Sequence, residues 1–377
     1  IMLWDMAGDE RRELVAGIRP AYSPTGHILY QREDGLWALP FSIDSLTVTG
    51  ESFLIRQGAD SASVARDGTL VYRESDDDGP QQLVWKSREG RTLGTIGQPQ
   101  VRIWGPRISP DGKSIAVHGV DNGNQDIWIH DTARSVKMRL TSDPAQENRA
   151  IWSPDGRHII FSSNRNGDYD VFVRATDGSG EERALFGMSG DQWAMDWSAD
   201  GKYLIVDSFS SGQPQKLFYV EGPLEREARE PALLLGTESS VRDSSFSPDG
   251  KYVAYTSNET GREEVFVQRF PELGGKVQVS INSGSRPRWR ADGKEMYFVQ
   301  EVTLIAVPVS TAPDFTVGNP EILFEHSNLR QDGGQQYDVS ADGQRFVVME
   351  SVNPEEQATV RLVQNWFAEF RDQEERE

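Results

Sequence analysis

A short turn-forming stretch recurs eight times along this chain of 377 residues and divides it into units of similar length. The clearest copy is Ser153-Pro154-Asp155-Gly156, and the glycines of successive copies are 42, 44, 44, 45, 49, 43 and 50 residues apart. The copies end at Gly26, Gly68, Gly112, Gly156, Gly201, Gly250, Gly293 and Gly343. A period of roughly 40 to 50 residues with several short strands per unit is typical of a β-propeller, whose blades are four-stranded sheets around a channel.

The residue types in this stretch are those of a tight hairpin. Proline restricts φ at the first corner, aspartate accepts hydrogen bonds from backbone amides just ahead of it, and glycine takes the positive φ that closes the turn. We therefore expect Asp155 and its counterparts to shape turns and not to act as catalytic acids.

Two units show four strands each. In the first unit, strands are expected at 149–152, 159–163, 170–174 and 184–186. In the second unit, the second, third and fourth strands are expected in the same order at 252–257, 264–268 and 277–280. Third strands in the remaining units are expected at 35–41, 82–86, 126–130, 216–220 and 304–309. These strands are continuously apolar and aromatic, which is typical of strands buried on both faces.

The two ends of the chain are expected to complete one blade together. Residues 1–19 hold two apolar runs before the first turn, and residues 327–366 hold an inner strand pair at 336–339 and 345–349 and a third strand at 359–363. With seven full blades over 20–326, this predicts a single all-β domain over 1–366, an eight-bladed propeller closed by a composite blade, followed by a charged tail at 367–377. Seven blades is the alternative if the ends do not combine.

The amino-acid composition excludes some classes of binding partner and some kinds of chemistry. The formal charge of −20 and the pI of about 4.7 argue against nucleic acid and anionic membranes, which reward clusters of Lys and Arg. There is no cysteine, so disulfides and thiolate chemistry are excluded. No apolar run has the 18 or so residues of a membrane span, and the start at Ile1 reads as a strand, so we expect a mature or excised domain, monomeric and without membrane contact of its own.

The motif around Trp152 resembles a known repeat. The pattern is Arg149-Ala150-Ile151-Trp152-Ser153-Pro154-Asp155-Gly156, then Ile159-Ile160-Phe161-Ser162-Ser163-Asn164-Arg165, Gly167 and Asp170-Val171-Phe172-Val173. It is similar to the repeat of TolB-like propellers, also called WD40-like repeats. The Gly-His and Trp-Asp pairs of true WD40 blades are not found in this sequence.

A second resemblance concerns the ending Val360-Arg361-Leu362-Val363-Gln364-Asn365-Trp366-Phe367-Ala368-Glu369-Phe370, together with 35–41 and 82–85. These segments are similar to propellers that follow a kinase domain and a membrane span in bacterial receptor-type Ser/Thr protein kinases. The resemblance implies an extracytoplasmic sensor or protein-interaction domain within a larger signalling protein, with a cytoplasmic location as the alternative.

The sequence lacks the motifs of a kinase, of an α/β-hydrolase and of a catalytic zinc site. A kinase would need His-Arg-Asp and Asp-Phe-Gly, and the stretch ending Gly112-Lys113-Ser114 has Arg107 where a phosphate-binding loop needs glycine. The nearest approach to a hydrolase elbow, 187–191, has Asp191 in place of its last glycine. The histidines, His27, His118, His130, His158 and His326, have no metal-ligand spacing, so no zinc site is expected.

Calcium is the one cofactor that the sequence leaves open. The loops 121–126 and 164–170 each hold several side-chain oxygens, although neither has the spacing of an EF-hand. The same residue types suit plain hairpin loops, and we expect no cofactor.

The loops on the face opposite the turns are the more irregular ones, and irregular loops on a rigid repeating scaffold commonly bind ligands. Arginine and aromatic side chains are frequent there, as in protein-binding hot spots. The candidate ligand-binding residues at this channel mouth are Arg19, Arg102, Trp104, Glu147, Asn148, Arg149, Gln192, Trp193, Arg242, Asp243, Arg286 and Tyr337. The alternative is that these residues pair across neighbouring blades and only fix the channel.

Three functions remain open on the sequence. The leading hypothesis is a non-catalytic module that binds a protein, peptide or cell-envelope ligand at the channel mouth. The second is a propeller enzyme, a hydrolase or lyase for a small molecule or sugar, with a metal held in the channel. The third is a structural propeller without a ligand.

Overall fold

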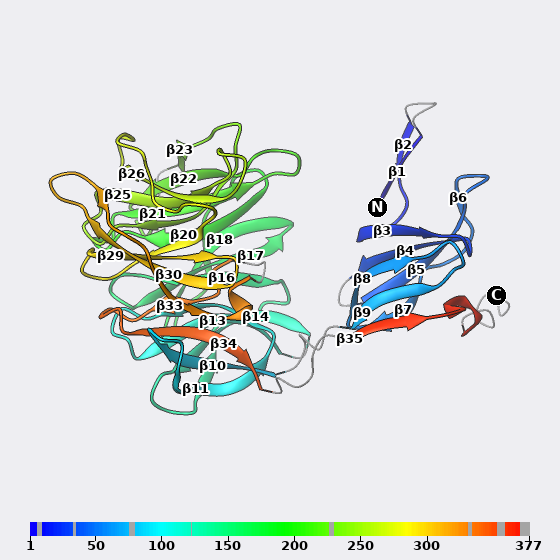
Figure 1. The fold of residues 1–377 in the computed structure, drawn as a ribbon, viewed down its shortest axis with the longest axis horizontal. Coiled ribbons are helices and arrows are strands. Elements are labelled where there is room, and N and C mark those ends of the chain that lie inside the picture. Colours follow the sequence, from blue (N-terminus) through cyan, green and yellow to red (C-terminus); the bar gives the residue numbers. More distant parts are fainter. Residues whose placement is uncertain are drawn as a thin grey trace. The chain divides into compact units, whose positions relative to one another are not determined.

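The computed structural model describes residues 1–5, 10–32, 35–74, 80–121, 123–225, 230–330, 334–352 and 359–369, and almost all of its regular structure is β-strand. The chain divides into two compact units. Unit 1 contains residues 1–79 and 353–377, and unit 2 contains residues 80–352 (Figure 1).

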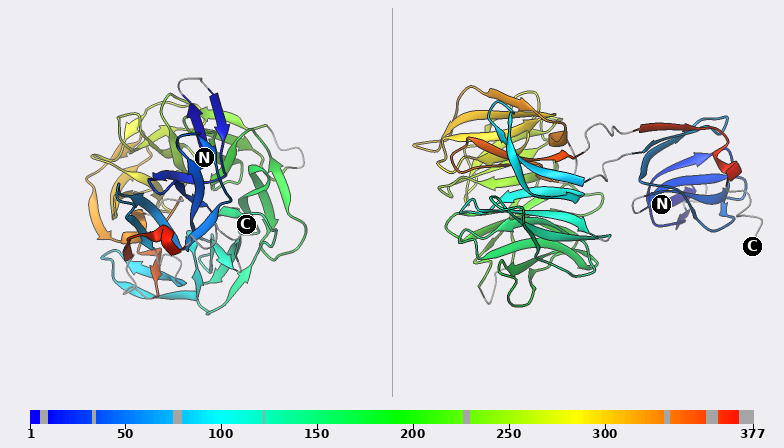
Figure 2. Two further views of the ribbon diagram at one scale, coloured as in Figure 1. Left: turned by 90° about the vertical axis from the view of Figure 1, so that its right-hand side faces the viewer. Right: turned by 90° about the horizontal axis from the view of Figure 1, so that it is seen from below.

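Unit 2 is a ring of six antiparallel sheets, which Figure 2 shows face-on in its left view. Five sheets are each built from one continuous segment. The first sheet contains β12 (Ile103–Ile108), β13 (Ser114–Asp121), β14 (Asn124–Asp131) and β15 (Lys137–Arg139), and the second contains β16 (Glu147–Trp152), β17 (His158–Asn166), β18 (Asp168–Ala175) and β19 (Arg183–Phe186). The third contains β20 (Asp191–Trp197), β21 (Tyr203–Phe209), β22 (Lys216–Glu221) and β23 (Ala232–Leu235), and the fourth contains β24 (Val241–Phe246), β25 (Tyr252–Ser257), β26 (Glu264–Arg269) and β27 (Val277–Gln278). The fifth contains β28 (Ser285–Trp289), β29 (Glu295–Gln300) and β30 (Thr303–Ser310), and both β31 (Thr316–Val317) and β32 (Glu321–Glu325) pair with β30.

The sixth sheet is composite and closes the ring. Its order is β11 (Thr92–Val101), β10 (Pro80–Ser87), β34 (Arg345–Ser351) and β33 (Asp338–Val339), and the short 3-10 helix η2 (Ser327–Arg330) precedes β33. β10 runs antiparallel to β34, with Leu83 opposite Met349 and Trp85 opposite Val347. The outer strands therefore come from the start of unit 2 and the inner strands from its end.

Hydrophobic side chains fill each contact between neighbouring sheets of the ring. Six clusters of buried residues correspond to the six contacts. At the composite sheet, Leu83 and Met349 pack with Ile115 of the next blade, and Phe346 packs with Tyr297 of the preceding one. Every blade in unit 2 is thus covered on both faces, which explains the continuously apolar strands.

The turn motifs have the structure expected of them. In five copies the serine hydroxyl donates to the aspartate two residues later at 2.6 to 2.7 Å, in Ser109–Asp111, Ser153–Asp155, Ser198–Asp200, Ser247–Asp249 and Ser340–Asp342. The aspartate also accepts a backbone amide, as Asp155 does from Arg157 at 3.0 Å. The bond from serine is the main reason that the pKa of Asp155 lies below 3.8. These aspartates are turn residues.

Unit 1 contains a hairpin, β1 (Met2–Asp5) with β2 (Glu10–Glu13), and two further sheets. One consists of β3 (Ile18–Ser23), β4 (His27–Arg32) and β5 (Gly35–Ser42), with β6 (Thr47–Val48) and β7 (Phe53–Gln57) both paired to β5; the other has the order β35 (Thr359–Val363), β9 (Leu70–Glu74) and β8 (Ala59–Val64). Leu29 and Leu36 of the first pack against Leu70 and Tyr72 of the second, and Trp366 of η3 (Trp366–Glu369) joins this core.

The sequence correctly predicts an all-β propeller of four-stranded blades, but the blade count and boundaries differ from the prediction. It predicts eight blades in one domain over 1–366, whereas the structure has six blades within 80–352 and a separate unit. It also predicts that 1–19 supply the outer strands of the closing blade, whereas residues 80–101 do so. Of the predicted tail 367–377, residues 370–377 lie outside the described part of the chain.

The physical reason is an exchange of third strands. The segment 82–86, predicted to follow β9 in one sheet, pairs with β34, and the segment 359–363, predicted to follow β34, pairs with β9. β9 and β34 each present an antiparallel edge with apolar residues, so either could accept either segment. The spacing of the turns identifies the repeating units but not which strand edges pair between them.

Candidate ligand-binding site at the channel mouth

The innermost strand of each continuous blade contains a β-bulge four residues before the first residue of the turn motif. The register shifts lie around Gly105, Arg149, Ala194, Asp243 and Arg286. Four of these residues have positive φ: 63° at Gly105, 52° at Arg149, 54° at Asp243 and 57° at Arg286. Positive φ is unfavourable for side chains other than glycine, so its recurrence at one offset marks a feature of the whole ring. A bulge re-aims the side chain that it carries.

Side chains of the preceding blade hold the amides at these bulges. The acceptors are His118 Nδ1 for the Arg149 amide at 3.4 Å, Asp207 Oδ2 for the Asp243 amide at 3.1 Å and Thr256 Oγ1 for the Arg286 amide at 3.1 Å. His118, Asp207 and Thr256 each lie nine residues after the first residue of their own turn motif. The channel wall is therefore connected from blade to blade through polar contacts.

A cavity of about 370 Å³ lies at one mouth of the channel. Its lining comes from the first three continuous blades and comprises Trp104, His118, Gln125, Gln146, Asn148, Arg149, Tyr169 and Trp193. Trp104, Asn148 and Trp193 each lie five residues before a turn serine, so they are at equivalent positions on adjacent blades. Four of the twelve residues predicted from the sequence, Trp104, Asn148, Arg149 and Trp193, therefore line one cavity.

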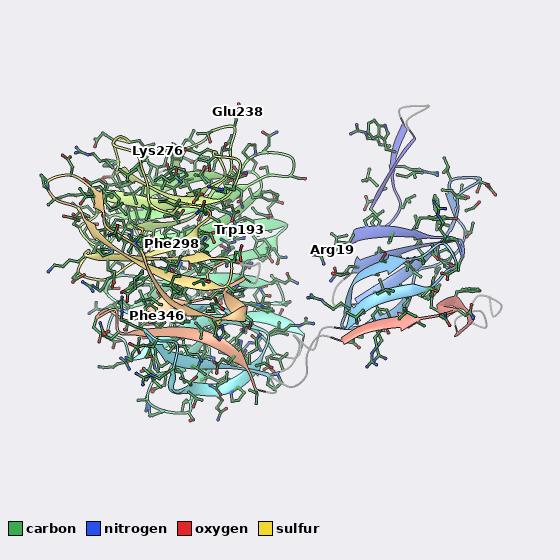
Figure 3. All side chains as sticks on the ribbon, in the orientation of Figure 1. Arg19, Trp193, Glu238, Lys276, Phe298 and Phe346 are labelled. Atoms are coloured by element: carbon green, nitrogen blue, oxygen red, sulfur yellow. The ribbon has the colours of Figure 1, made fainter. Side chains whose placement is uncertain are left out.

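Aromatic rings form the walls of this cavity. Trp104 stacks on His118, with ring centroids 5.7 Å apart and an interplanar angle of 25°. Trp193, labelled in Figure 3, stacks on Phe209 at 6.1 Å and 22°. Both indoles are partly exposed, and no hydrogen bond to either indole N–H occurs within the described part of the chain. They present flat apolar surfaces with an available donor at the edge.

An aromatic ring, a sulfur atom and a glycine backbone surround the side chain of Arg149. Its Cζ lies 4.6 Å from the ring centroid of Trp193, and its Nη1 donates to Met195 Sδ at 3.1 Å. Gly334, at φ 102°, brings its backbone so close that an added Cβ would lie 3.5 Å from the guanidinium carbon. No carboxylate of the described residues lies within 4.0 Å of its nitrogens. Burial lowers the pKa of Arg149 from 12.5, and the carboxylates of Asp243 and Asp207 act in the opposite direction from farther away.

His118 is neutral at physiological pH. Burial, and next the charge of Arg149, lowers its pKa to about 3. A neutral ring can leave Nδ1 unprotonated to accept the Arg149 amide, which is the role its position requires. His118 therefore contributes a flat surface for Trp104 and no charge to the cavity.

Two buried carboxylates belong to neighbouring blades, Asp207 on β21 and Asp243 on β24. Both are about 1% exposed, and Arg242 Nη1 lies 3.5 Å from Asp243 Oδ2. Burial raises the pKa of Asp207 to about 8, so this group holds its proton at neutral pH. Asp207 therefore adds little negative charge near Arg149.

Other predicted residues have internal partners. Glu147 is buried and paired with Arg165, and burial raises its pKa to about 7. The side chain of Gln192 is buried and donates to Met188 O at 2.9 Å. Arg242 Nε donates to Glu263 at 3.1 Å.

The remaining predicted residues divide between the ring and unit 1. Tyr337 Oη donates to Arg286 O at 2.9 Å, and both residues are buried. Arg102, at φ 48°, accepts a hydrogen bond at its carbonyl from the Val120 amide. Arg19, labelled in Figure 3, belongs to unit 1. Its Nη1 lies 3.5 Å from Ser61 Oγ. None of these four residues lines the cavity.

Sequence reasoning missed four lining residues: His118, Gln125, Gln146 and Tyr169. Gln125 and Tyr169 both lie sixteen residues after a turn serine, at the second residue of β14 and of β18, the third strands of their blades. Tyr169 Oη donates to Gln146 Oε1 at 3.0 Å. This shared offset of sixteen residues could identify Gln125 and Tyr169 from the sequence, because residues at the same offset occupy equivalent positions on successive blades.

Four further cavities open among the turn motifs, and each has acidic lining residues. One of about 680 Å³ includes Asp155, Asp200, Glu221 and Glu225. A second cavity, of about 370 Å³, is lined by residues of all six blades, among them Arg107, Arg288, Asp196 and Asp338. The other two include Asp111 with Asp338 and Asp342, and Asp111 with Asp155. Each of these cavities on the turn side of the ring therefore has acidic side chains in its lining.

The loops considered for calcium use their oxygens internally. Asn164 Oδ1 accepts the Gln146 amide at 2.9 Å, and Asp168 Oδ2 accepts the Gly190 amide at 3.1 Å. Asn122 of the other loop lies outside the described residues. Across the described ranges, no three His, Asp or Glu side chains are grouped as ligands for one metal ion. The same ranges contain no helix of the length and apolarity needed to span a membrane.

Comparison with known proteins agrees with this architecture. Residues 61–220 match the family model described as the TolB beta propeller domain. The structure of a putative TolB from Agrobacterium tumefaciens has a TM-score of 0.56 at 16% identity, covering 72% of this chain and 98% of that one. The chain therefore contains a TolB-like propeller.

Curated relatives match over shorter segments. "Uncharacterized peptidase YuxL" of Bacillus subtilis is 27% identical over 202 residues, which are 44% of this chain and 31% of the relative. "Tol-Pal system protein TolB" of Alcanivorax borkumensis is 33% identical over 98 residues, which are 26% of this chain and 23% of the relative. The chain spans less than a third of the length of either protein.

Proposed function

We propose that this chain is a non-catalytic binding module that recognises a protein or peptide ligand at the channel mouth lined by Trp104, Asn148, Arg149 and Trp193. The observation that carries the proposal is the convergence of these residues from three adjacent blades on one cavity. Tryptophan, tyrosine and arginine dominate protein-binding hot spots because they combine a large contact area with hydrogen-bonding groups. Here a rigid ring of sheets holds them in place.

The relatives do not decide between binding and catalysis. One relative is called a Tol-Pal system protein and another a peptidase, and this chain covers only part of each. The binding hypothesis rests on the cavity itself, which combines neutral amides, aromatic rings and one arginine.

Selection of peptides from a displayed random library against the purified chain tests the proposal. Enriched peptides are expected to lose at least tenfold in affinity for the Trp104→Ala and Trp193→Ala variants, as truncation of hot-spot aromatics commonly does. Leu233→Ala, which changes a side chain 55% exposed on the outer strand β23, serves as the control and should bind normally. Equal binding by all three variants would place the site elsewhere.

A propeller enzyme is the second candidate, and the buried carboxylates favour it. Asp207 holds its proton with a pKa of about 8, and Asp243 is its buried neighbour, so the channel contains a potential general acid. Turnover of a small molecule or sugar that is abolished in Asp207→Asn, with the fold retained, would support this candidate against the binding module.

We further propose that the chain is part of a larger bacterial signalling protein and acts outside the cytoplasm as a monomer. The support is the resemblance of 360–370 to the propellers of receptor-type kinases. The reading frame before Ile1 tests this directly, since a kinase domain and a membrane-spanning segment are expected there. A reading frame that encodes a complete secreted protein without a partner domain would contradict it.

A further inference from the structure

The charge around the channel-mouth cavity is unusual for this chain. The sequence has 59 acidic residues against 39 basic ones. Yet the eight residues that line this cavity include one arginine and no aspartate or glutamate. The four cavities on the turn side all have acidic lining residues. The channel mouth is therefore the cavity in this group where a negatively charged ligand meets no lining carboxylate.

The available hydrogen-bonding groups at this cavity include several donors. The indole N–H groups of Trp104 and Trp193 are unused within the described ranges. The side chain of Asn148, partly exposed, makes no hydrogen bond there either, so its amide group can donate. Neutral His118 adds no charge. These groups suit a ligand rich in acceptor oxygens.

Arg149 is the charged element of this set, and no carboxylate of the described residues lies within 4.0 Å of its guanidinium nitrogens. Arg165 nearby shows the contrasting case, since Asp143, Glu147 and Glu182 all lie within 4.0 Å of its guanidinium. Arg149 instead has Trp193 on one side, Gly334 near it and Met195 Sδ at Nη1. A partly buried cation is stabilised most by an anion that pairs with it. The planar guanidinium matches a carboxylate through two parallel hydrogen bonds.

We propose that the channel mouth recognises a carboxylate of its peptide ligand, bound by the guanidinium of Arg149 between the walls formed by Trp104 and Trp193. This inference rests on the proposed function and specifies the ligand group that the site selects. The amide side chains of Gln125, Gln146 and Asn148 lie beside this position and suit the peptide groups next to the carboxylate. The carboxylate is either the C-terminus of a chain or the side chain of aspartate or glutamate.

Matched pools of short peptides test the inference and separate the two sources. N-acetylated tripeptides would be prepared with a free C-terminus, with a C-terminal amide, and with a C-terminal amide plus one aspartate or glutamate. Binding to the purified chain is measured by affinity selection with mass spectrometry. At least one carboxylate pool is expected to bind about tenfold or more tightly than the neutral amides, because charge-assisted hydrogen bonds are the strong ones. Which pool binds identifies the source.

Substitutions at Arg149 complete the test. Arg149→Gln should remove the preference for carboxylates, and Arg149→Lys should restore part of it because the charge returns without the planar fork. Arg269→Gln is the matched control, since it makes the same charge change at an exposed ion pair with Asp314. Circular dichroism and thermal unfolding show that each variant is folded.

The outcomes are distinct for the inference and for the proposed function. The inference is overturned if peptides bind equally with and without a carboxylate, or if they bind Arg149→Gln as tightly as the unchanged chain. In either case the proposed binding function is retained if Trp104→Ala still abolishes binding. Absence of binding by every pool at millimolar concentration also overturns the inference. A different result would contradict the proposed function: peptides selected from the displayed library would bind Trp104→Ala and Trp193→Ala as tightly as the unchanged chain.

Discussion

The guanidinium of Arg149 lies over the indole of Trp193, with Cζ 4.6 Å from the ring centroid, although the two residues belong to neighbouring blades. Arg149 is on β16 at a positive-φ bulge, and Trp193 is on β20. The contact therefore links the conformation of one inner strand to the side chain of the next. Several measurable consequences depend on such contacts between blades.

Replacement of Trp193 by leucine should destabilise the ring by about 1 to 3 kcal/mol, because the substitution removes both the cation–π contact and aromatic packing on Phe209. Trp193→Phe keeps an aromatic face for Arg149 and should lose clearly less. Differential scanning calorimetry of the two variants measures the difference. Equal losses would mean that apolar area alone matters at this position.

Asp207 should make the ring less stable as pH rises from about 4 to 8. Burial raises its folded-state pKa to about 8, whereas an unfolded chain ionises near its ordinary value of 3.8, so within this window the unfolded state loses the proton and the folded state keeps it. Asp207→Asn should flatten this dependence by up to about 1.4 kcal/mol per pH unit. Melting temperatures at pH 5, 6.5 and 8 measure it. The exposed Asp44→Asn is the control, and an unchanged slope in Asp207→Asn would contradict the assignment.

The turn aspartates should have the opposite pH dependence. The pKa of Asp155 is lowered by the hydrogen bond from Ser153, so its contribution is present above 3.8 and disappears as pH falls through the lowered folded-state value. Asp155→Asn should cost about 0.5 to 1 kcal/mol at pH 7, a small effect because the carboxylate is exposed to solvent. The cost should vanish once the pH falls below the lowered folded-state pKa of Asp155, where the carboxyl is protonated in both states. A cost that persists in acid would point to lost geometry and not to lost charge.

The closure of the ring can be tested with engineered disulfides, because the chain has no native cysteine. Val84 lies opposite Val348 across β10 and β34, so Val84→Cys combined with Val348→Cys should cross-link on oxidation. The eight-blade prediction places 82–86 beside β9, so Val84→Cys combined with Val71→Cys is the contrasting pair and should stay reduced. Peptide mapping by mass spectrometry distinguishes the two, and the reverse result would restore the eight-blade pairing.

The sequence predicts local structure well because turns are decided by neighbouring residues. Ser153, Asp155 and Gly156 interact within five residues of one another, so their types suffice to place a hairpin. The third strand expected at 126–130 is likewise found within β14. The closure is different, since Leu83 pairs with Met349 across most of the chain, and no local pattern distinguishes β34 from β9 as its partner.

The candidate site was predictable in part for the same reason. Trp104, Asn148 and Trp193 share one offset from their turns, and this places them at one height on adjacent blades. The sequence does not show which Arg or Glu residues find partners within the fold. Glu147 pairs with Arg165, near the end of β17, and it is absent from the lining although Asn148 is present.

The composite sheet has a consequence for synthesis. Ser87 and Arg345 face each other across β10 and β34, so a ribosome must add more than 250 residues after β10 before its partner exists. At about 5 to 20 residues per second this delay is roughly 10 to 50 s, far longer than a hairpin needs to form. During that interval one edge of β10 can pair with β11, and the nearest earlier strand that could pair with its other edge is β9. We therefore expect a nascent chain to form the local pair first and to release it when β34 emerges.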